Sequence, residues 1–285
     1  MKSIHSLLAI ALLSACAMTA SAQHGESVAP EPASPALLEH FYREIQKWDT
    51  GLPTTPGASA SMSQAMRESE FMTTRNQLRQ IGVKAWPLSP RVADLLLRTE
   101  RNQYNLAWIL TDMTPESPAT PETVAALTSK YQTANAADRL VALAQLGKTR
   151  HLAAVPLLRS AATADEPVVR LVAYIALAYA GNADPEAAAA ALGAGLTDRE
   201  KHARTGAVNS LRLLGVKAQS AAPALGEYLK TRDNVFQATA ALKVMPLSYL
   251  RPRKPELESI LAESRLTEFQ KRDTVEILMR LESEK

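Results

Sequence analysis

Apolar residues recur every three or four positions along most of the chain, with polar residues between them. This spacing lines up one apolar face on a helix of 3.6 residues per turn, so it predicts amphipathic helices. Segments that alternate apolar and polar residues with a period of two, as strands do, are almost absent. The pattern therefore predicts an all-α protein, with helix following helix over residues 62–285.

The helical pattern repeats every 34 residues in the middle of the chain. Three residue types keep this register over three copies: Leu143, Leu177 and Leu211; Gly147, Gly181 and Gly215; Thr163, Thr197 and Thr231. Self-similarity at a fixed period of this size is typical of stacked repeats. Each copy contains two helices that cannot bury both apolar faces alone, so neighbouring copies are expected to stack around a continuous core.

The sequence GVKA occurs twice, starting at Gly82 and at Gly215, and each time a proline follows eight residues after the glycine. We interpret both copies as the turn between the two helices of a pair. The glycine would close the first helix in the left-handed conformation, and the proline would lie early in the second helix. The same closing role is expected for Gly181.

The N-terminal part of the chain changes composition from segment to segment. Residues 1–22 combine a positive start, a short apolar run and an A-x-A cleavage site, which together predict a signal peptide. Residues 23–34 predict a flexible leader, residues 35–48 an amphipathic helix and residues 49–61 a linker. The helix is expected to dock on the first repeat as an N-terminal cap, because its aromatic face would otherwise be exposed, and the alternative is that it is offered to a partner.

Cys16, the only cysteine of the chain, gives the N-terminal segment a second interpretation. The residues that end at Cys16 read LSAC, which looks like a bacterial lipobox. Cleavage there would remove residues 1–15 and leave a lipid on Cys16, whereas the residues after it continue as in an ordinary signal peptide. Both interpretations predict export to the periplasm or cell envelope, soluble or lipid-anchored, and a mature chain without disulfides.

The repeated pair resembles the HEAT-repeat family, in which an aspartate precedes a V-R pair and an A-x-x-A-L-x-x-x-G run. The best match consists of Asp165, Val169, Arg170, Ala173, Ala176, Leu177 and Gly181, and the next of Asp198, Ala203, Arg204, Ala207, Leu211 and Gly215. Tetratricopeptide repeats share the 34-residue period, but their W-x2-L-G-x2-Y signature is missing.

The resemblance implies a right-handed α-solenoid of about six HEAT-like helix pairs, with an N-terminal helix and a C-terminal capping helix. The capping helix is expected to turn a polar face outwards. In the family, the aspartate before one helix and the arginine within it form a ladder between repeats. This structural role is implied for Asp165, Arg170, Asp198 and Arg204.

Charge and motifs exclude several classes of function. The net charge is only +3 and is spread along the chain, whereas a nucleic-acid-binding protein needs a concentrated basic face. The sequence contains no metal-binding spacing of His or Cys, no G-x-S-x-G and no glycine-rich phosphate loop. We therefore predict a protein without catalytic residues, metal ligands or cofactors.

Three features are candidates for contact with a partner, and packing or a solvated loop would explain each of them as well. They are a tryptophan in the first GVKA turn, two aromatic residues on one helix face, and a proline-flanked basic turn that suits an acidic partner or a lipid headgroup. The six residues are Trp86, Tyr104, Trp108, Arg251, Arg253 and Lys254.

Repeats, export and the lack of a catalytic constellation together predict a scaffold or adaptor in the cell envelope. It would bind a protein or peptide partner on an extended concave surface lined mainly by the second helices. A membrane contact is expected only through a lipid on Cys16. Two alternatives stay open: an accessory or regulatory subunit of an envelope enzyme, and a lyase, hydrolase or small-molecule-binding protein on a HEAT-like fold.

Overall fold

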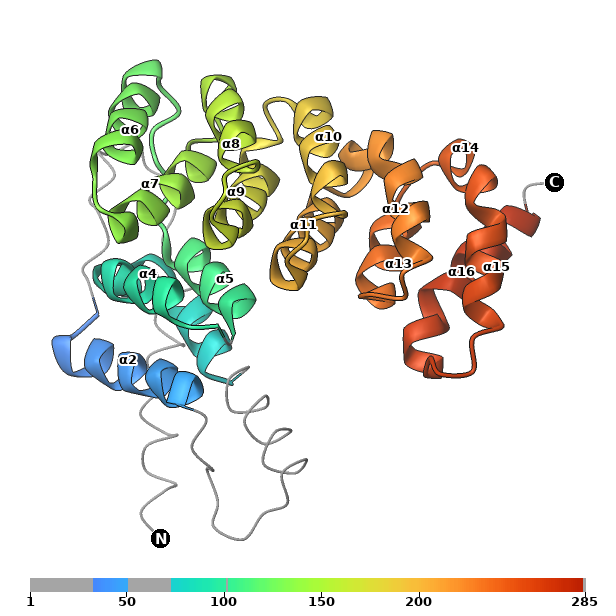
Figure 1. The fold of residues 1–285 in the computed structure, drawn as a ribbon, viewed down its shortest axis with the longest axis horizontal. Coiled ribbons are helices and arrows are strands. Elements are labelled where there is room, and N and C mark those ends of the chain that lie inside the picture. The colour runs from blue at the N-terminus through green and yellow to red at the C-terminus, as the bar shows by residue number, and fades with distance from the viewer. Residues whose placement is uncertain (1–32, 51–72, 101, 284–285) are drawn as a thin grey trace, which may run out of the picture. The chain divides into compact units, whose positions relative to one another are not determined.

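The computed structural model describes residues 33–50, 73–100 and 102–283. Within these ranges the regular elements are α-helices and 3₁₀ helices, and no strand occurs (Figure 1). The all-α prediction is confirmed for this part of the chain. The predicted signal peptide with Cys16 and most of the predicted linker lie outside the described residues.

The N-terminal elements begin with a helix that is two residues longer than predicted. They are α2 (Pro35–Thr50), a helix over residues 73–81, η1 (Gly82–Leu88), α4 (Ser89–Arg98), α5 (Gln103–Met113) and α6 (Pro121–Thr133). Here α denotes an α-helix and η a 3₁₀ helix.

The remaining elements follow one another with short connections. They are α7 (Ala136–Thr149), η2 (Leu152–Ala154), α8 (Val155–Ala161), α9 (Pro167–Ala180), α10 (Pro185–Gly195), α11 (Lys201–Leu214), η3 (Gly215–Ala221), α12 (Ala222–Leu229), α13 (Val235–Lys243), α14 (Leu247–Leu250), η4 (Arg251–Arg253), α15 (Lys254–Leu261) and α16 (Glu268–Ser283).

From α7 onwards the helices alternate between two layers (Figure 1). In each layer every helix packs against the next one of that layer. One layer consists of α7, α9, α11, α13 and α16, and the other of α8, α10, α12 and α15. The alternation follows from the two apolar faces of each helix pair, which are buried only against neighbouring pairs. Helix α9 lies deepest, and every residue from Val168 to Ala178 is buried.

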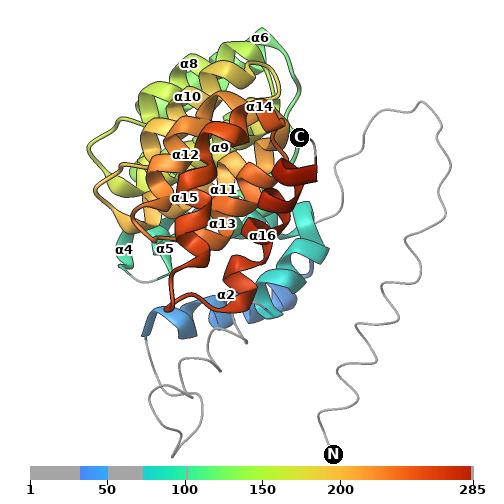
Figure 2. The same ribbon diagram turned by 90° about the vertical axis from the view of Figure 1, so that its right-hand side faces the viewer.

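Helices α4 and α5 form a further layer, on the side of α7 and α9 that faces away from α8 and α10 (Figures 1 and 2). Helix α4 packs against α7, and α5 packs against α7, α9 and α11. Helix α5 therefore takes no place in either of the two alternating layers. The reason is that α5 is apolar around most of its circumference, with residues 106–111 all buried, so it needs several partners.

Helix α2 docks on η1 and α4, as expected for the N-terminal amphipathic helix. Phe41, Tyr42 and Ile45 are buried. At the margin, Arg91 forms an ion pair with Glu39 at 2.7 Å, and its guanidinium carbon lies 3.6 Å from the centre of the Tyr42 ring. The buried part of the apolar face of α2 is thus covered by η1 and α4, whereas Leu37 is exposed.

The repeated glycines have two different roles. Gly82 and Gly215 adopt positive φ angles of +57° and +60°, which an L side chain rarely adopts, and each ends a helix as predicted. The prediction of a left-handed conformation for Gly181 is wrong, because its φ is −62°. At Gly147 and Gly181 the neighbouring atoms leave no room for a side chain. A Cβ on Gly147 would lie 2.7 Å from the Ala176 Cα, and a Cβ on Gly181 would lie 2.8 Å from the Ala188 Cβ.

The repeated threonines close the second helix of successive pairs. Each hydroxyl donates a hydrogen bond to the backbone carbonyl three residues earlier, which a helix end leaves without an intrahelical partner. The pairs are Thr163 to Ser160 at 2.9 Å, Thr197 to Ala194 at 2.9 Å and Thr231 to Tyr228 at 2.7 Å.

The last helix, α16, begins with the predicted capping box. The Thr267 N–H donates to the Gln270 side chain at 2.9 Å, and the Gln270 N–H donates to the Thr267 hydroxyl at 3.3 Å. The exposed side of this helix is mixed rather than polar, because Phe269, Val275 and Met279 are exposed together with Glu268, Arg272 and Glu282. Phe269 stacks on Phe236 of α13, with ring centroids 4.8 Å apart.

Candidate functional site

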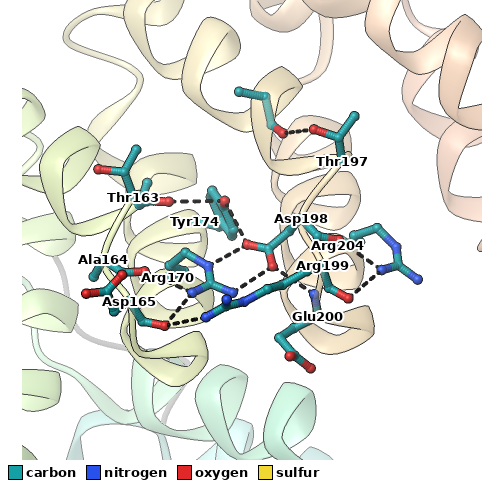
Figure 3. Close-up of polar contacts among 12 residues, drawn as sticks. Thr163, Ala164, Asp165, Arg170, Tyr174, Thr197, Asp198, Arg199, Glu200 and Arg204 are labelled. Carbon is teal, nitrogen blue, oxygen red and sulfur yellow. Dashed lines mark hydrogen bonds and ion pairs between the residues drawn. The ribbon is translucent and has the colours of Figure 1, made fainter.

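The polar site predicted from the sequence is a ladder of charged side chains. It joins Arg170 on α9 and the turn before α9 to Asp198, in the turn before α11 (Figure 3). Arg170 donates from Nε and Nη2 to the two carboxylate oxygens of Asp198, at 2.6 and 2.8 Å. This is the bidentate geometry that a guanidinium and a carboxylate form best. The two side chains are only 8% and 3% exposed, so little water reaches the pair.

The remaining donor of Arg170 holds its own turn in place. Its Nη1 donates to the backbone carbonyls of Ala164 and Asp165, at 2.9 and 2.8 Å (Figure 3). Asp165 thus enters the ladder through its backbone oxygen, which also accepts from Arg199 at 3.1 Å. The structure brings the predicted ladder residues together, but the Asp165 carboxylate is not the group that takes part.

The protonation of the ladder follows from its contacts. Burial acts to raise the pKa of Asp198, but the hydrogen bonds from Arg170 and from the Glu200 N–H outweigh it and hold this pKa below its usual value. The Tyr174 hydroxyl lies 3.2 Å from Asp198, and burial together with that carboxylate raises the tyrosine pKa. The ladder is therefore a fixed ion pair at neutral pH.

The ladder continues beyond the residues predicted from the sequence. Arg204 donates to the backbone of Asp198 at 2.9 Å and to the Asp233 carboxylate at 2.8 Å. Lys243 then pairs with Asp273 on α16 at 3.1 Å. Asp233 had a usable signal in the sequence, since it follows a repeated threonine just as Asp165 does.

The ladder residues line a shallow depression rather than an enclosed cavity. It has a volume of about 310 Å³ and is bordered by Thr163, Ala164, Asp165, Arg170, Asp198 and Arg199. The charges of Arg170 and Asp198 are satisfied by each other. The ladder stabilises the contact between neighbouring pairs.

Two of the predicted contact features are tied into the fold. Trp86 lies in η1, is half-buried and packs against the core, so it is not a free anchor. The basic segment is not an irregular loop, because α14, η4 and α15 follow one another there without a break. Within it Arg253 faces Glu256 at 4.0 Å and Lys254 faces Glu258 at 3.4 Å, which offsets part of the positive charge.

The third feature, Tyr104 and Trp108 on α5, belongs to a larger cluster. The two rings meet edge to face with centroids 6.3 Å apart, and Trp108 is buried. Arg75, from the helix over residues 73–81, lies 5.8 Å above the Trp108 ring and 3.8 Å from the Asp112 carboxylate. Arg75 and Asp112 are 15% and 14% exposed.

Helices α7 and α9 contribute the other side of this cluster. Lys148 is 8% exposed, and its ammonium lies 4.0 Å from the centre of the Tyr179 ring. Burial lowers the pKa of Lys148, although the charges of Glu116 and Asp112 oppose the shift. Burial together with the Asp112 charge raises the pKa of Tyr179 to about 12. We call Arg75, Trp108, Asp112, Lys148 and Tyr179 the buried charge cluster.

Burial also raises the pKa of Asp112, in spite of the nearby Arg75 and Arg79. Sequence reasoning found only the aromatic pair of this region and missed Arg75, Asp112, Lys148 and Tyr179. These residues come from four separate helices and form no local motif, so only the packing of α5 across α7 and α9 brings them together.

The described residues contain neither a membrane-spanning helix nor a group of metal-binding side chains. No helix among them is long and apolar enough to cross a membrane. They also contain no group of three or more His, Cys, Asp or Glu side chains arranged to hold a metal ion. Comparison with protein-family models and with curated proteins finds no match to this chain.

Proposed function

We propose that residues 62–285 form a HEAT-like α-solenoid that acts as a protein-binding scaffold or adaptor in the cell envelope. The series packing of the α7, α9, α11, α13 and α16 layer supports the solenoid, because each of its links joins one pair to the next. The ladder supports it too, since Arg170, Arg204 and Lys243 each join a pair to the one that follows.

The observation that carries the binding function is an apolar edge where α11 and α13 end. Leu213, Val216 and Val244 are 48%, 51% and 52% exposed. Val244 lies beside the turn at Gly215, where a Cβ would be 3.9 Å from the Val244 Cγ2. Exposed apolar side chains that gather in one place mark contact surfaces more often than isolated ones do.

The charges around the apolar edge indicate the chemistry of the partner. Arg212, in the last turn of α11, and Lys217, within the second GVKA turn, are both exposed. An apolar centre with a polar rim is the usual anatomy of a protein interface. A protein or peptide with apolar and acidic side chains is therefore the partner that fits this edge best.

Site-directed crosslinking in cells tests this proposal. A photoreactive amino acid at Val216 is expected to give a discrete adduct, and the Leu213→Glu substitution is expected to abolish it. The same probe at Lys130, an exposed residue of α6, serves as the control. Equal crosslinking at both positions, or none at Val216, would contradict the proposal.

The identity of the crosslinked protein separates a scaffold from an accessory subunit, because the two differ only in the partner. Cell fractionation tests the export that both require. An envelope protein that moves from the membrane to the soluble fraction on Cys16→Ser substitution is a lipoprotein, whereas a wild-type protein in the soluble periplasmic fraction contradicts the lipoprotein interpretation.

A further inference from the structure

The buried charge cluster contains more positive than negative charge. Arg75 and Lys148 are both largely buried, and Asp112 is the only carboxylate among the five residues. Asp112 is 3.8 Å from Arg75, which is longer than a direct hydrogen bond. A buried charge without a close counter-charge is strongly unfavourable, so one more negative group is required for balance.

The surrounding charges do not remove this imbalance. Arg79 lies 3.5 Å from Asp112 and adds a further positive charge, although its side chain is 60% exposed. The charge of Glu116 acts on Lys148, but Glu116 is also paired with Arg150 at 2.9 Å. Among the described residues, the positive charge of the cluster is therefore only partly neutralised.

Two buried donors in the cluster have no acceptor in the described structure. They are the Nε of Arg75 and the Nε1 of Trp108, and one buried acceptor, the Oδ2 of Asp112, is also without a hydrogen-bond partner there. The guanidinium lies over the indole ring, so both N–H groups belong to one small region. Buried donors almost always have partners in native proteins, and each exception calls for a physical explanation, such as a bound ligand.

We propose that the buried charge cluster is a binding site for an oxyanion, the carboxylate or phosphate group of a small ligand. Such a group carries the missing charge and supplies acceptor oxygens to Arg75, Trp108 and Lys148. Charge-assisted hydrogen bonds of this type are shorter and stronger than neutral ones. The site lies among α5, α7 and α9 and is separate from the apolar edge, so it goes beyond the scaffold function.

Thermal unfolding of the purified chain with sodium phosphate or sodium acetate tests the site, with sodium chloride at equal ionic strength as the reference. At about ten times the dissociation constant, the bound anion is expected to raise the Tm by about 3–5 °C. A rise with phosphate alone assigns the site to phosphate, and a rise with acetate assigns it to carboxylate. Equal effects of all three salts would reflect screening and overturn the proposal.

Three variants of the cluster, with one exposed-lysine variant as the control, separate anion binding from general stability. Lys148→Met is expected to abolish the anion-dependent Tm shift, whereas Lys130→Met, which changes an exposed lysine, keeps it. Trp108→Phe retains a ring but removes the indole N–H, and is expected to weaken the affinity about tenfold. Asp112→Asn makes the site more positive and is expected to tighten anion binding.

The opposite effects of Lys148→Met and Asp112→Asn are decisive, because a purely structural role would change the baseline Tm and leave the anion-dependent shift intact. If Lys148→Met retains the full shift, the proposal is wrong. Calorimetric titration with phosphate or acetate then gives the dissociation constant for each variant, and Trp108→Phe provides the comparison where another variant fails to fold.

Discussion

At the scale of single residues, Gly147 shows how tightly α7 and α9 approach each other. We predict that Gly147→Ala lowers the free energy of unfolding by about 2 kcal/mol, because the new methyl group meets backbone atoms that cannot move aside. Its Cβ would lie 2.7 Å from the Ala176 Cα and 2.8 Å from the Ala176 carbonyl oxygen. Urea denaturation measures the change.

Gly193 is the matched control for this prediction. It also lies within a helix, α10, but its added Cβ would be 3.5 Å from the nearest neighbouring side-chain atom. Gly193→Ala should therefore stabilise the protein by about 0.5–1 kcal/mol through helix propensity alone. If both variants shift the urea midpoint in the same direction, close packing does not explain Gly147.

The ladder gives a second prediction for single residues. Asp198→Asn leaves Arg170 buried without its counter-charge, which should cost about 3 kcal/mol of unfolding free energy. Asp165→Asn removes a carboxylate that takes no part in the ladder, so its effect should stay within about 0.5 kcal/mol. Comparable losses of unfolding free energy in the two variants would show that the buried ion pair does not stabilise the fold more than an exposed carboxylate does.

The pH dependence of the ladder has a definite sign. The pKa of Asp198 is lower in the folded protein than in the unfolded chain, where it is about 3.9. Its stabilising contribution is therefore present above that pH and is lost as the pH falls through the folded value. The difference in urea midpoint between wild type and Asp198→Asn should therefore stay constant from pH 6 to about pH 4 and shrink as the pH falls further, and a difference that stays constant below about pH 4 would contradict this account.

At the scale of elements, α16 depends on the cap at its start. Thr267→Ala removes the hydroxyl that accepts from the Gln270 N–H and should cost about 1 kcal/mol. Gln270→Ala keeps this hydroxyl but removes the acceptor of the Thr267 N–H, so its effect should be smaller. Thermal unfolding of both variants ranks the two hydrogen bonds of the cap by the loss of Tm. A larger loss for Gln270→Ala would mean that the bond from the Thr267 N–H contributes more.

At the scale of the whole described molecule, α5 spans three successive helices of one layer. It packs against α7, α9 and α11, whereas α16 packs mainly on α13 and α15. Leu106→Ala, at a buried position of α5, is expected to lower hydrogen-exchange protection in α7, α9 and α11 together. Protection in α16 should stay nearly unchanged, and a uniform loss along the chain would show that α5 does not define a separate cooperative unit.

Much of this architecture can be predicted from local patterns. Apolar spacing predicts the helices, and the 34-residue register identifies the repeated Thr197 and Thr231, whose hydroxyls close successive helices. The positive φ of Gly82 and Gly215 also follows from the sequence, because a turn that needs such an angle selects glycine. These features depend on neighbouring residues along the chain, so the sequence by itself determines them.

Contacts between distant segments were decided only by the tertiary structure. Nothing local to Gly147 indicates that α9 approaches too closely for a side chain, and nothing local to α5 indicates that it crosses three helices. The buried charge cluster has the same origin, since Arg75, Asp112 and Lys148 meet only when their helices pack. Helix packing depends on the shapes of whole faces, and a periodic pattern records that a face is apolar without recording which face covers it.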